Sequence, residues 1–390
     1  MYKEHFFPVL EDFMKICQFL KCLPFRTDKR QRRVVRCSRA RLDIFQGQCA
    51  LSGLYMASLF LNLCLRESST AERLQGFTFL MIYLIAVVGR WDFDRVNGTA
   101  QVVNMFMDFE EKSVKDLPEF GPTIIAKLMK LFAQLIQASV FVLIGLQTTL
   151  LIYFPCTPPF VQSMFCDQMG LRPSSGIPRL GVVILEAWIC THIAFSGVTC
   201  IIFTLFVGIV CILSYFRALE RYLNRLITTS QSSRDLDGCI QFYRELQVLE
   251  KSFNAFLMAK IVPVLMFCIP TIQIMAQCVC INLHDQIGFP EFLIFPLFLV
   301  NAAIVNIFVF SLAAGIHNQS ASLLQSMKRR SSETAGKKGG IQRREICNCT
   351  VLKIKFGSNF IDRATPLILQ NFCLNQTMSL TLANSRKLVA

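Results

Sequence analysis

The sequence predicts an all-α, polytopic membrane protein built as a bundle of seven transmembrane helices. Only 17% of the 390 residues are charged and 53% are hydrophobic, whereas soluble domains carry about 25% charged residues. The uncharged stretches 131–166, 261–284, 292–327 and 364–385 are each long enough to cross a bilayer core of roughly 30 Å as a helix. They are continuously apolar, which excludes the alternating pattern of a transmembrane β-barrel. The composition also excludes a soluble enzyme, a disordered protein and a secreted disulfide scaffold.

Seven apolar segments follow one another along the chain. They cover residues 44–65, 74–88, 123–154, 180–216, 256–282, 290–316 and 361–383. The third and fourth exceed the bilayer thickness, so we expect each to tilt or to continue as a helix into the water. Residues 217–251 repeat apolar side chains at helical spacing, with a break at 228–237. This pattern predicts a helical hairpin that extends the fourth and fifth spans, and that either contacts another subunit or packs on itself.

The positive charges predict the orientation in the membrane. Most of the 40 Lys and Arg residues lie in the N-terminal segment and in the loops after the second, fourth and sixth spans. The opposite side carries few of them, namely Arg66, Arg73, Arg172, Arg179, Arg386 and Lys387. Because basic residues gather in cytoplasmic loops, the N-terminus is predicted inside the cell and the C-terminus outside. The net charge of +14 therefore indicates orientation rather than binding to nucleic acid.

This topology divides the chain into four regions. We expect a cytoplasmic N-terminal segment (1–43), six spans with a cytoplasmic helical extension (44–316, the extension being 217–255), a cytoplasmic linker or anchor segment (317–360), and a last helix with an extracellular tail (361–390). Within the third region, residues 328–344 are rich in Ser, Gly and basic side chains. Such a composition is typical of a flexible linker.

The C-terminal part of the chain resembles a known family. The run VLKIKFGSNFIDRATPL at 351–367 is followed by an apolar helix that contains Gln376 and Thr377, and it is similar to the arthropod gustatory and odorant receptor superfamily. The seven spans, the inside N-terminus and the long fourth span are similar too. Gustatory receptors commonly end the last helix with T-Y-h-x-x-x-x-Q-F. Here Thr377 matches, while Met378, Asn384 and Ser385 replace Tyr, Gln and Phe, and we interpret the chain as gustatory-receptor-like.

The resemblance implies a function. It implies a chemosensory receptor subunit in the plasma membrane that forms a ligand-gated, non-selective cation channel, opened by a small organic tastant or odorant. It further implies a homo- or hetero-tetramer of related subunits, surrounded by membrane lipid, in which each last helix lines a central pore. The ligand would bind among the outer halves of the other spans. No enzyme activity, cofactor or nucleic-acid partner is expected.

Polar residues on the last segment form two stripes. At 100° per residue, Gln370, Thr377, Thr381 and Asn384 share one stripe, and a second one holds Asn371, Asn375 and Ser379. Polar side chains in a bilayer face a partner or water. The two stripes are therefore a pore face and a subunit contact, or they hold the helix in a monomeric bundle. Together with the resemblance, they predict that the pore is lined by Gln370, Thr377, Met378, Thr381 and Asn384. The lack of charge on these residues predicts weak selectivity among cations.

Ligand-binding candidates lie in spans four to six. Glu186 is the only acid in the interior of an apolar span, away from its ends, and Trp188 and His192 follow it closely. An ionisable residue within the membrane indicates a functional site, although Glu186 could instead reach the lipid headgroups. The other candidates are Gln273 and Gln277, one helical turn apart in the fifth span, and Phe298 in the sixth. Each of these could equally serve helix packing.

Cysteines and motifs complete the sequence-based predictions. Cys156 and Cys166 lie in the longest outer loop, where a disulfide can form, although Cys278 and Cys280 are also close to the outer side. No phosphate-binding loop, HExxH or GxSxG motif is present, and no His pair has metal-ligand spacing, so no metal or cofactor is expected.

A G-protein-coupled receptor or a transporter is the alternative function. The orientation and the lack of D-R-Y and N-P-x-x-Y disfavour the first, and the lack of repeats disfavours the second.

Overall fold

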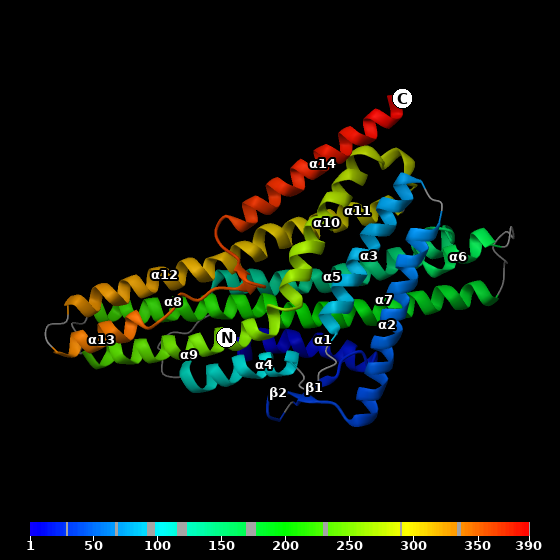
Figure 1. Ribbon diagram of the computed structural model, residues 1–390. Helices are drawn as coiled ribbons and strands as arrows, with labels where there is room; N and C mark the ends of the chain where they lie inside the picture. Colours follow the sequence, from blue (N-terminus) through cyan, green and yellow to red (C-terminus); the bar gives the residue numbers. More distant parts are fainter. Residues whose placement is uncertain are drawn as a thin grey trace.

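A computed structural model describes residues 1–28, 30–66, 69–91, 98–114, 123–168, 177–228, 233–288, 291–333 and 337–389 of the chain. The described residues form a bundle of long helices with two short β-hairpins (Figure 1). Two helices, α2 (Arg39–Leu65) and α3 (Thr70–Arg90), run steeply across the longest helices of the bundle. One extensive hydrophobic core joins the bundle from the N-terminal helix to residues just before the last helix.

Six helices among the described residues are long and apolar enough to cross a membrane. They are Arg39–Leu65, Thr70–Arg90, Ile124–Tyr153, Arg179–Arg225, Ile261–Asn282 and Ile294–Ser332, and they coincide with the first six predicted segments. The seventh predicted segment also forms a helix, α14 (Thr365–Val389). Its many Asn, Gln, Ser and Thr residues keep it out of that group, because they lower its hydropathy. The chain is thus a multi-pass membrane protein, and its seventh span stays a prediction.

Two of these helices continue far beyond a bilayer. The first consists of α7 (Ile177–Ile201), the π-helical turn η3 (Ile202–Phe206) and α8 (Val207–Thr228). The second consists of α11 (Ile294–Ile304), the π-helical turn η6 (Val305–Val309) and α12 (Phe310–Glu333). The predicted hairpin is present, since α9 (Ser233–Leu257) returns beside α8. Figure 1 shows α8, α9, α12 and α13 (Lys337–Cys347) together at one end of the molecule.

The prediction of a flexible linker at 328–344 is wrong for its described residues. Helix α12 continues to Glu333 and α13 covers Lys337–Cys347. The reason is a buried stripe at helical spacing, made by Ser320, Leu323, Leu324, Met327 and Ser331. Helix α12 packs against α8, and Ser320 also contacts the Tyr243 hydroxyl of α9. Lys328 and Arg329 are exposed, whereas Arg330 Nη1 donates to the Leu223 carbonyl of α8 at 3.2 Å. Burial of an amphipathic face stabilises a helix more than local composition disfavours it.

The N-terminal segment also has structure that the sequence pattern did not indicate. It forms the π-helical turn η1 (Tyr2–Phe6), α1 (Phe7–Phe19), and the antiparallel strands β1 (Phe25–Asp28) and β2 (Arg33–Arg36). Phe13 packs edge-on against Phe203 of η3, with ring centroids 5.3 Å apart. The segment after α3 adds α4 (Gly98–Phe109) and η2 (Glu110–Val114). The buried Glu110 carboxylate accepts from Tyr2 N at 2.6 Å and from the Tyr215 hydroxyl at 2.9 Å, which ties the N-terminal segment to α8.

The remaining elements connect the long helices. They are α5 (Ile124–Tyr153), α6 (Val161–Gln168), α10 (Ile261–Asn282), the 3-10 turns η4 (His284–Gln286) and η5 (Glu291–Leu293), and the strands β3 (Lys355–Phe356) and β4 (Asn359–Phe360).

The turn between β3 and β4 holds Gly357 at φ 55°, a conformation that glycine adopts without strain. Asp362 then accepts from Thr365 N at 2.8 Å and caps α14. Hydrogen bonds from Thr365 hold the pKa of the Asp362 carboxyl below its ordinary value.

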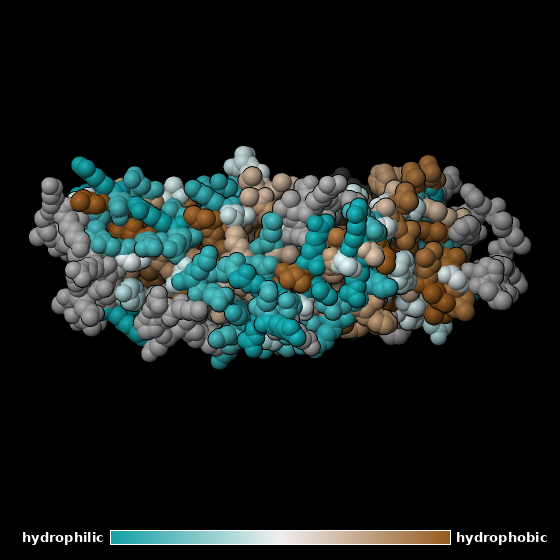
Figure 2. Space-filling model, turned by 90° about the horizontal axis from the view of Figure 1, so that it is seen from below, coloured by the Kyte–Doolittle hydropathy of each residue, from teal (hydrophilic) through white to brown (hydrophobic). Residues whose placement is uncertain are grey.

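The surface separates by polarity along the length of the molecule. Figure 2 views the molecule from the side of α4 and the β1–β2 hairpin, and most of that face is hydrophilic. Hydrophobic residues gather toward the end where α6 lies. Exposed apolar side chains of the described helices include Leu54, Phe60 and Leu65 of α2 and Leu180 and Ile184 of α7. Such a large exposed apolar surface is typical of contact with lipid.

Candidate ligand cavities and pore helix

An apolar cavity of about 200 Å³ lies between α3, α5, α7, α10 and α11, and it is open on one side rather than enclosed. Its walls include Ile82 of α3 and Phe298 of α11, and among its described lining residues the polar ones are Ser139 and Asn301. Phe298 is therefore a predicted ligand residue that lies at a cavity. A cavity with apolar walls and few polar groups suits a small, uncharged organic molecule.

The π-helical turns inside the two longest helices border this inner cavity. The turn η3 contributes Ile202 and Phe206, and η6 contributes Val305. A π turn inside an α-helix is rare and is frequent at functional sites. The sequence contains no breaker at these turns, such as proline or a pair of glycines, that could have predicted them. Their position at one cavity distinguishes this cavity from the others in the molecule.

Glu186 supports the fold near the outer end of α7. Its side chain is buried, and Oε1 accepts from Val161 N at 2.6 Å and from the Tyr55 hydroxyl at 3.5 Å. The carboxylate thus binds the first residue of α6, where a helix presents unpaired N–H groups and the positive end of its dipole. Glu186 does not line the inner cavity, and its burial keeps it away from the headgroup surface. A ligand role for it stays a prediction.

We expect replacement of Glu186 by leucine to lower the free energy of unfolding by about 1–3 kcal/mol, since Val161 N and Tyr55 lose a buried acceptor. The measurement is thermal unfolding of purified protein in detergent. Leu185→Ala is the matched control, because Leu185 is the next residue of α7 and is 49% exposed. Unchanged stability together with a lost ligand response would make Glu186 a ligand contact instead.

His192 and Trp188 belong to a separate cluster. The two rings meet edge-on with centroids 4.5 Å apart, and His192 Nδ1 lies 2.8 Å from Nη1 of the buried Arg90. Arg90 Nη1 also donates to Ser52 Oγ at 3.2 Å, and its guanidinium lies 5.4 Å from the Phe45 ring centroid. The sequence did not single out Arg90, because a basic residue at the end of an apolar segment ordinarily marks the membrane surface.

The first polar stripe of α14 faces α10 of the same chain. Gln273 Nε2 donates to Gln370 Oε1 at 2.9 Å, and Asn306 Nδ2 donates to Gln273 Oε1 at 2.6 Å. Further along, the Thr377 hydroxyl donates to Gln277 Oε1 at 2.8 Å. The structure therefore brings the predicted ligand residues Gln273 and Gln277 to the predicted pore residues rather than to the cavity. They form an interhelical ladder of amides and hydroxyls.

The ladder continues to the outer end of both helices. Asn282 Nδ2 donates to Thr381 Oγ1 at 3.0 Å. Thr377 is 5% exposed, so its hydroxyl forms its hydrogen bonds within the chain. In this arrangement the first stripe binds α14 to α10 of the same chain, which is the alternative to a pore face. A pore role for Gln370, Thr377 and Thr381 stays a prediction, and the side chain of Asn384 lies outside the described residues.

The opposite face of α14 is left uncovered by its own chain. Met378 is 62% exposed there, and Asn371 and Asn375 are exposed with their side chains 3.4 Å apart. Leu374 and Leu382 flank them at 50% and 65% exposure. Helix α14 thus carries one polar stripe that the chain satisfies and a second one that faces outward.

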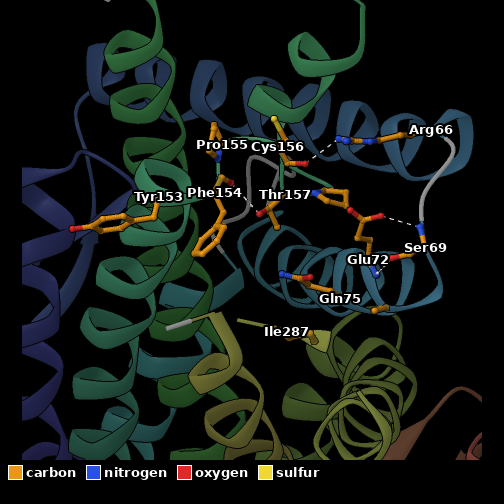
Figure 3. A pocket seen from close by; sticks show the side chains of 12 residues that line it. Arg66, Ser69, Glu72, Gln75, Tyr153, Phe154, Pro155, Cys156, Thr157 and Ile287 are labelled. Atoms are coloured by element: carbon orange, nitrogen blue, oxygen red, sulfur yellow. Dashed lines mark hydrogen bonds between the residues drawn. The ribbon is translucent and has the colours of Figure 1, made fainter. Parts of the chain in front are cut away.

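A larger outer pocket of about 550 Å³ opens between the start of α3 and the segment after α5 (Figure 3). Its polar side holds Arg66, Glu72 and Gln75, and Phe154 and Ile287 contribute apolar walls. Arg66 Nη1 donates to the carbonyl of Cys156 at 3.0 Å, and Glu72 Oε2 accepts from Ser69 N at 2.8 Å. These bonds fix the rim of the pocket.

Cys156, on the wall of this pocket, is disulfide-bonded. The side chain of Cys166, its predicted partner, lies outside the described residues, so the pairing itself stays a prediction. Cys278 and Cys280, the alternative partners near the outer side, are free.

No family model matches the chain, and no curated protein matches its sequence. Solved structures do match. The insect olfactory receptor OR5 from Machilis hrabei in complex with eugenol matches with a TM-score of 0.65 at 15% identity, over 98% of this chain and 100% of that one. A second structure of the same receptor matches with a TM-score of 0.68 at 13% identity, over 97% of this chain and 99% of that one. The resemblance to insect chemoreceptors is thereby confirmed at the level of structure, and this chain has the fold of an insect olfactory receptor.

Proposed function

We propose that the chain is a chemosensory receptor subunit of the plasma membrane that forms a ligand-gated, non-selective cation channel. The ligand is a small, uncharged organic tastant or odorant, and it binds in the inner cavity. Subunits assemble as a homo- or hetero-tetramer around α14. The gustatory-like C-terminal motif favours a taste role over an olfactory one.

The uncovered polar face of α14 carries this proposal. Asn371 and Asn375 are exposed on a helix whose other polar stripe is satisfied by α10. In a bilayer, amides facing lipid would lack hydrogen-bond partners, which costs free energy. Water in a central pore, or the same face of a neighbouring subunit, would supply partners. The fold shared with a receptor whose structure was solved in complex with eugenol supports a small organic ligand.

Voltage clamp tests the proposal. The chain is expressed alone and with related subunits, and a ligand panel is applied that begins with eugenol and continues with sugars and bitter aromatic compounds. We expect a cation current that persists when G proteins are blocked with GDP-β-S in the pipette. A response that GDP-β-S abolishes, or an epitope on the C-terminus that labels only after permeabilisation, would contradict the proposal.

Filling the inner cavity should abolish the response. We expect Ala302→Phe to remove the ligand-evoked current, because Ala302 is 6% exposed and lines a cavity of only about 200 Å³. The current is measured with surface expression monitored in parallel. Ala303→Phe is the matched control, since Ala303 is adjacent but does not line the cavity. Equal loss in both variants would show a packing defect rather than occupation of the ligand site.

A further inference from the structure

One face of α3 connects the outer pocket to the inner cavity. Gln75 lines the outer pocket and Ile82 lines the inner cavity. They are seven residues apart, which places them on the same face of the helix and roughly 10 Å apart along its axis. Phe79 lies between them on that face, four residues after Gln75 and three before Ile82. The two spaces are therefore separated along α3 by about one layer of side chains.

That layer is aromatic. Phe79 is 1% exposed and meets two other rings edge-on, Phe160 with centroids 5.0 Å apart and Phe298 with centroids 5.8 Å apart. Phe298 itself lines the inner cavity. Gly76 allows this arrangement, because a Cβ there would lie 2.8 Å from Leu63 Cδ1 and 3.5 Å from Pro159 N. The absence of a side chain at Gly76 brings the chain before Phe160 close to α3.

We propose that the outer pocket is a second ligand-binding site, from which the ligand reaches the inner cavity past Phe79. This inference rests on the proposed function and adds the route by which the ligand arrives. Phe79 acts as the partition between the two sites. Its contacts are ring-to-ring and edge-on, and no hydrogen bond of its side chain has to break when the ring turns aside.

The linings of the two sites define the class of ligand. The outer pocket offers water-facing polar groups on the side of Arg66 and Glu72 and apolar walls at Phe154 and Ile287, so it accepts molecules that have both kinds of surface. The inner cavity offers apolar walls, with Ser139 and Asn301 as its polar described lining residues. A charge would lose its solvation there. A molecule that passes from one to the other is uncharged, mostly apolar, and carries one hydroxyl or carbonyl group.

Binding kinetics test this route without relying on channel activity. The probe is 1-naphthol, a fluorescent uncharged aromatic alcohol, and it is mixed rapidly with the purified full chain in lipid nanodiscs. Removing two edge-to-face contacts in Phe79→Leu is expected to raise the association and dissociation rates together by about tenfold. The equilibrium dissociation constant then stays unchanged. Phe77→Leu is the matched control, because Phe77 lies on α3 and lines neither space.

A second variant pair tests the outer pocket itself. Ser69 lines the pocket and its hydroxyl caps α3 by accepting from Glu72 N at 3.3 Å. Ser69→Trp fills the pocket and loses the cap, whereas Ser69→Ala only loses the cap. We expect slower association in Ser69→Trp alone.

Three outcomes would overturn the inference. The first is an absence of saturable naphthol binding to the unaltered chain. The second is rates that neither Phe79→Leu nor Ser69→Trp changes, which would indicate arrival from the bilayer. The third is a changed dissociation constant with an unchanged association rate in Phe79→Leu, which would make Phe79 a contact of the bound ligand. Loss of evoked current with these kinetics intact would overturn the proposed function and leave the route standing.

Discussion

Replacing Asn375 by lysine is expected to suppress the cation current. In the proposed tetramer, the exposed face of α14 would place four lysine charges around the pore. Four unit charges about 7 Å from a cation oppose it by about 2 kcal/mol in water, which corresponds to more than about a tenfold fall in current. Asn375→Glu should act in the opposite direction and increase the preference for divalent cations, because acidic rings favour cations. Both effects are measured from current amplitude and reversal potential under ion substitution.

The neighbouring residue provides the control for this prediction. Gln376 is also an exposed amide of α14, and it lies about 100° around the helix from Asn375. Gln376→Lys introduces the same charge at nearly the same depth, but away from the face that holds Asn371 and Met378. Equal suppression by the two lysines would mean that charge on any side of α14 disturbs assembly. An unchanged current in Asn375→Lys would remove Asn375 from the pore.

Replacing Gln273 by leucine is expected to destabilise the contact between α10 and α14. The change leaves the buried Asn306 amide and the Gln370 side chain without the partner that each contacts in the structure. An unsatisfied buried group costs about 1–3 kcal/mol in soluble proteins, and the average interhelical hydrogen bond in a membrane contributes about 0.6 kcal/mol. We therefore expect a loss of about 0.6–3 kcal/mol, together with an altered basal current, because α14 is the proposed pore helix.

A double-mutant cycle isolates this interaction. Gln273→Leu combined with Gln370→Leu removes both partners, so the pair should lose less than the sum of the single changes, with a coupling of about 0.5–1.5 kcal/mol. Thermal unfolding in detergent and basal current at matched surface expression are the measurements. Thr271→Val is the control on α10, since Thr271 is half-buried and its hydroxyl donates to the Phe267 carbonyl of its own helix. Additive losses would contradict a direct interaction.

The spans could be predicted because lipid imposes a simple rule on the sequence. Long apolar segments predicted six of the helices, and apolar side chains at helical spacing predicted the hairpin of α8 and α9. The rule does not apply to the parts of the chain outside the predicted spans. There, α1 and the extension of α12 depend on which side chains find a partner, such as Phe13 against Phe203. A stripe like that of Leu323 and Met327 is visible in the sequence, but the basic residues beside it suggested a linker.

The candidate site was predicted less completely than the fold. A helical wheel separates the two stripes of α14, but it cannot say which of them has partners, because that depends on Gln273, Gln277 and Asn282 of α10. Glu186 was chosen for its rarity, and its contact with Val161 N depends on the path of a loop. Phe298 lies at the cavity, yet nothing in its own neighbourhood distinguishes it from Phe292 or Phe295.

The two π-helical turns have a mechanical consequence. Each holds one residue more than an α-helical turn, so its conversion to α geometry would rotate everything beyond it by about 100° about the helix axis. Both turns lie at the inner cavity, and the helices beyond them, α8 and α12, extend together to the far end of the molecule. A ligand that changes the shape of the cavity would therefore act on both π-helical turns. Such a conversion would rotate α8 and α12 about their own axes, without shifting either helix as a whole.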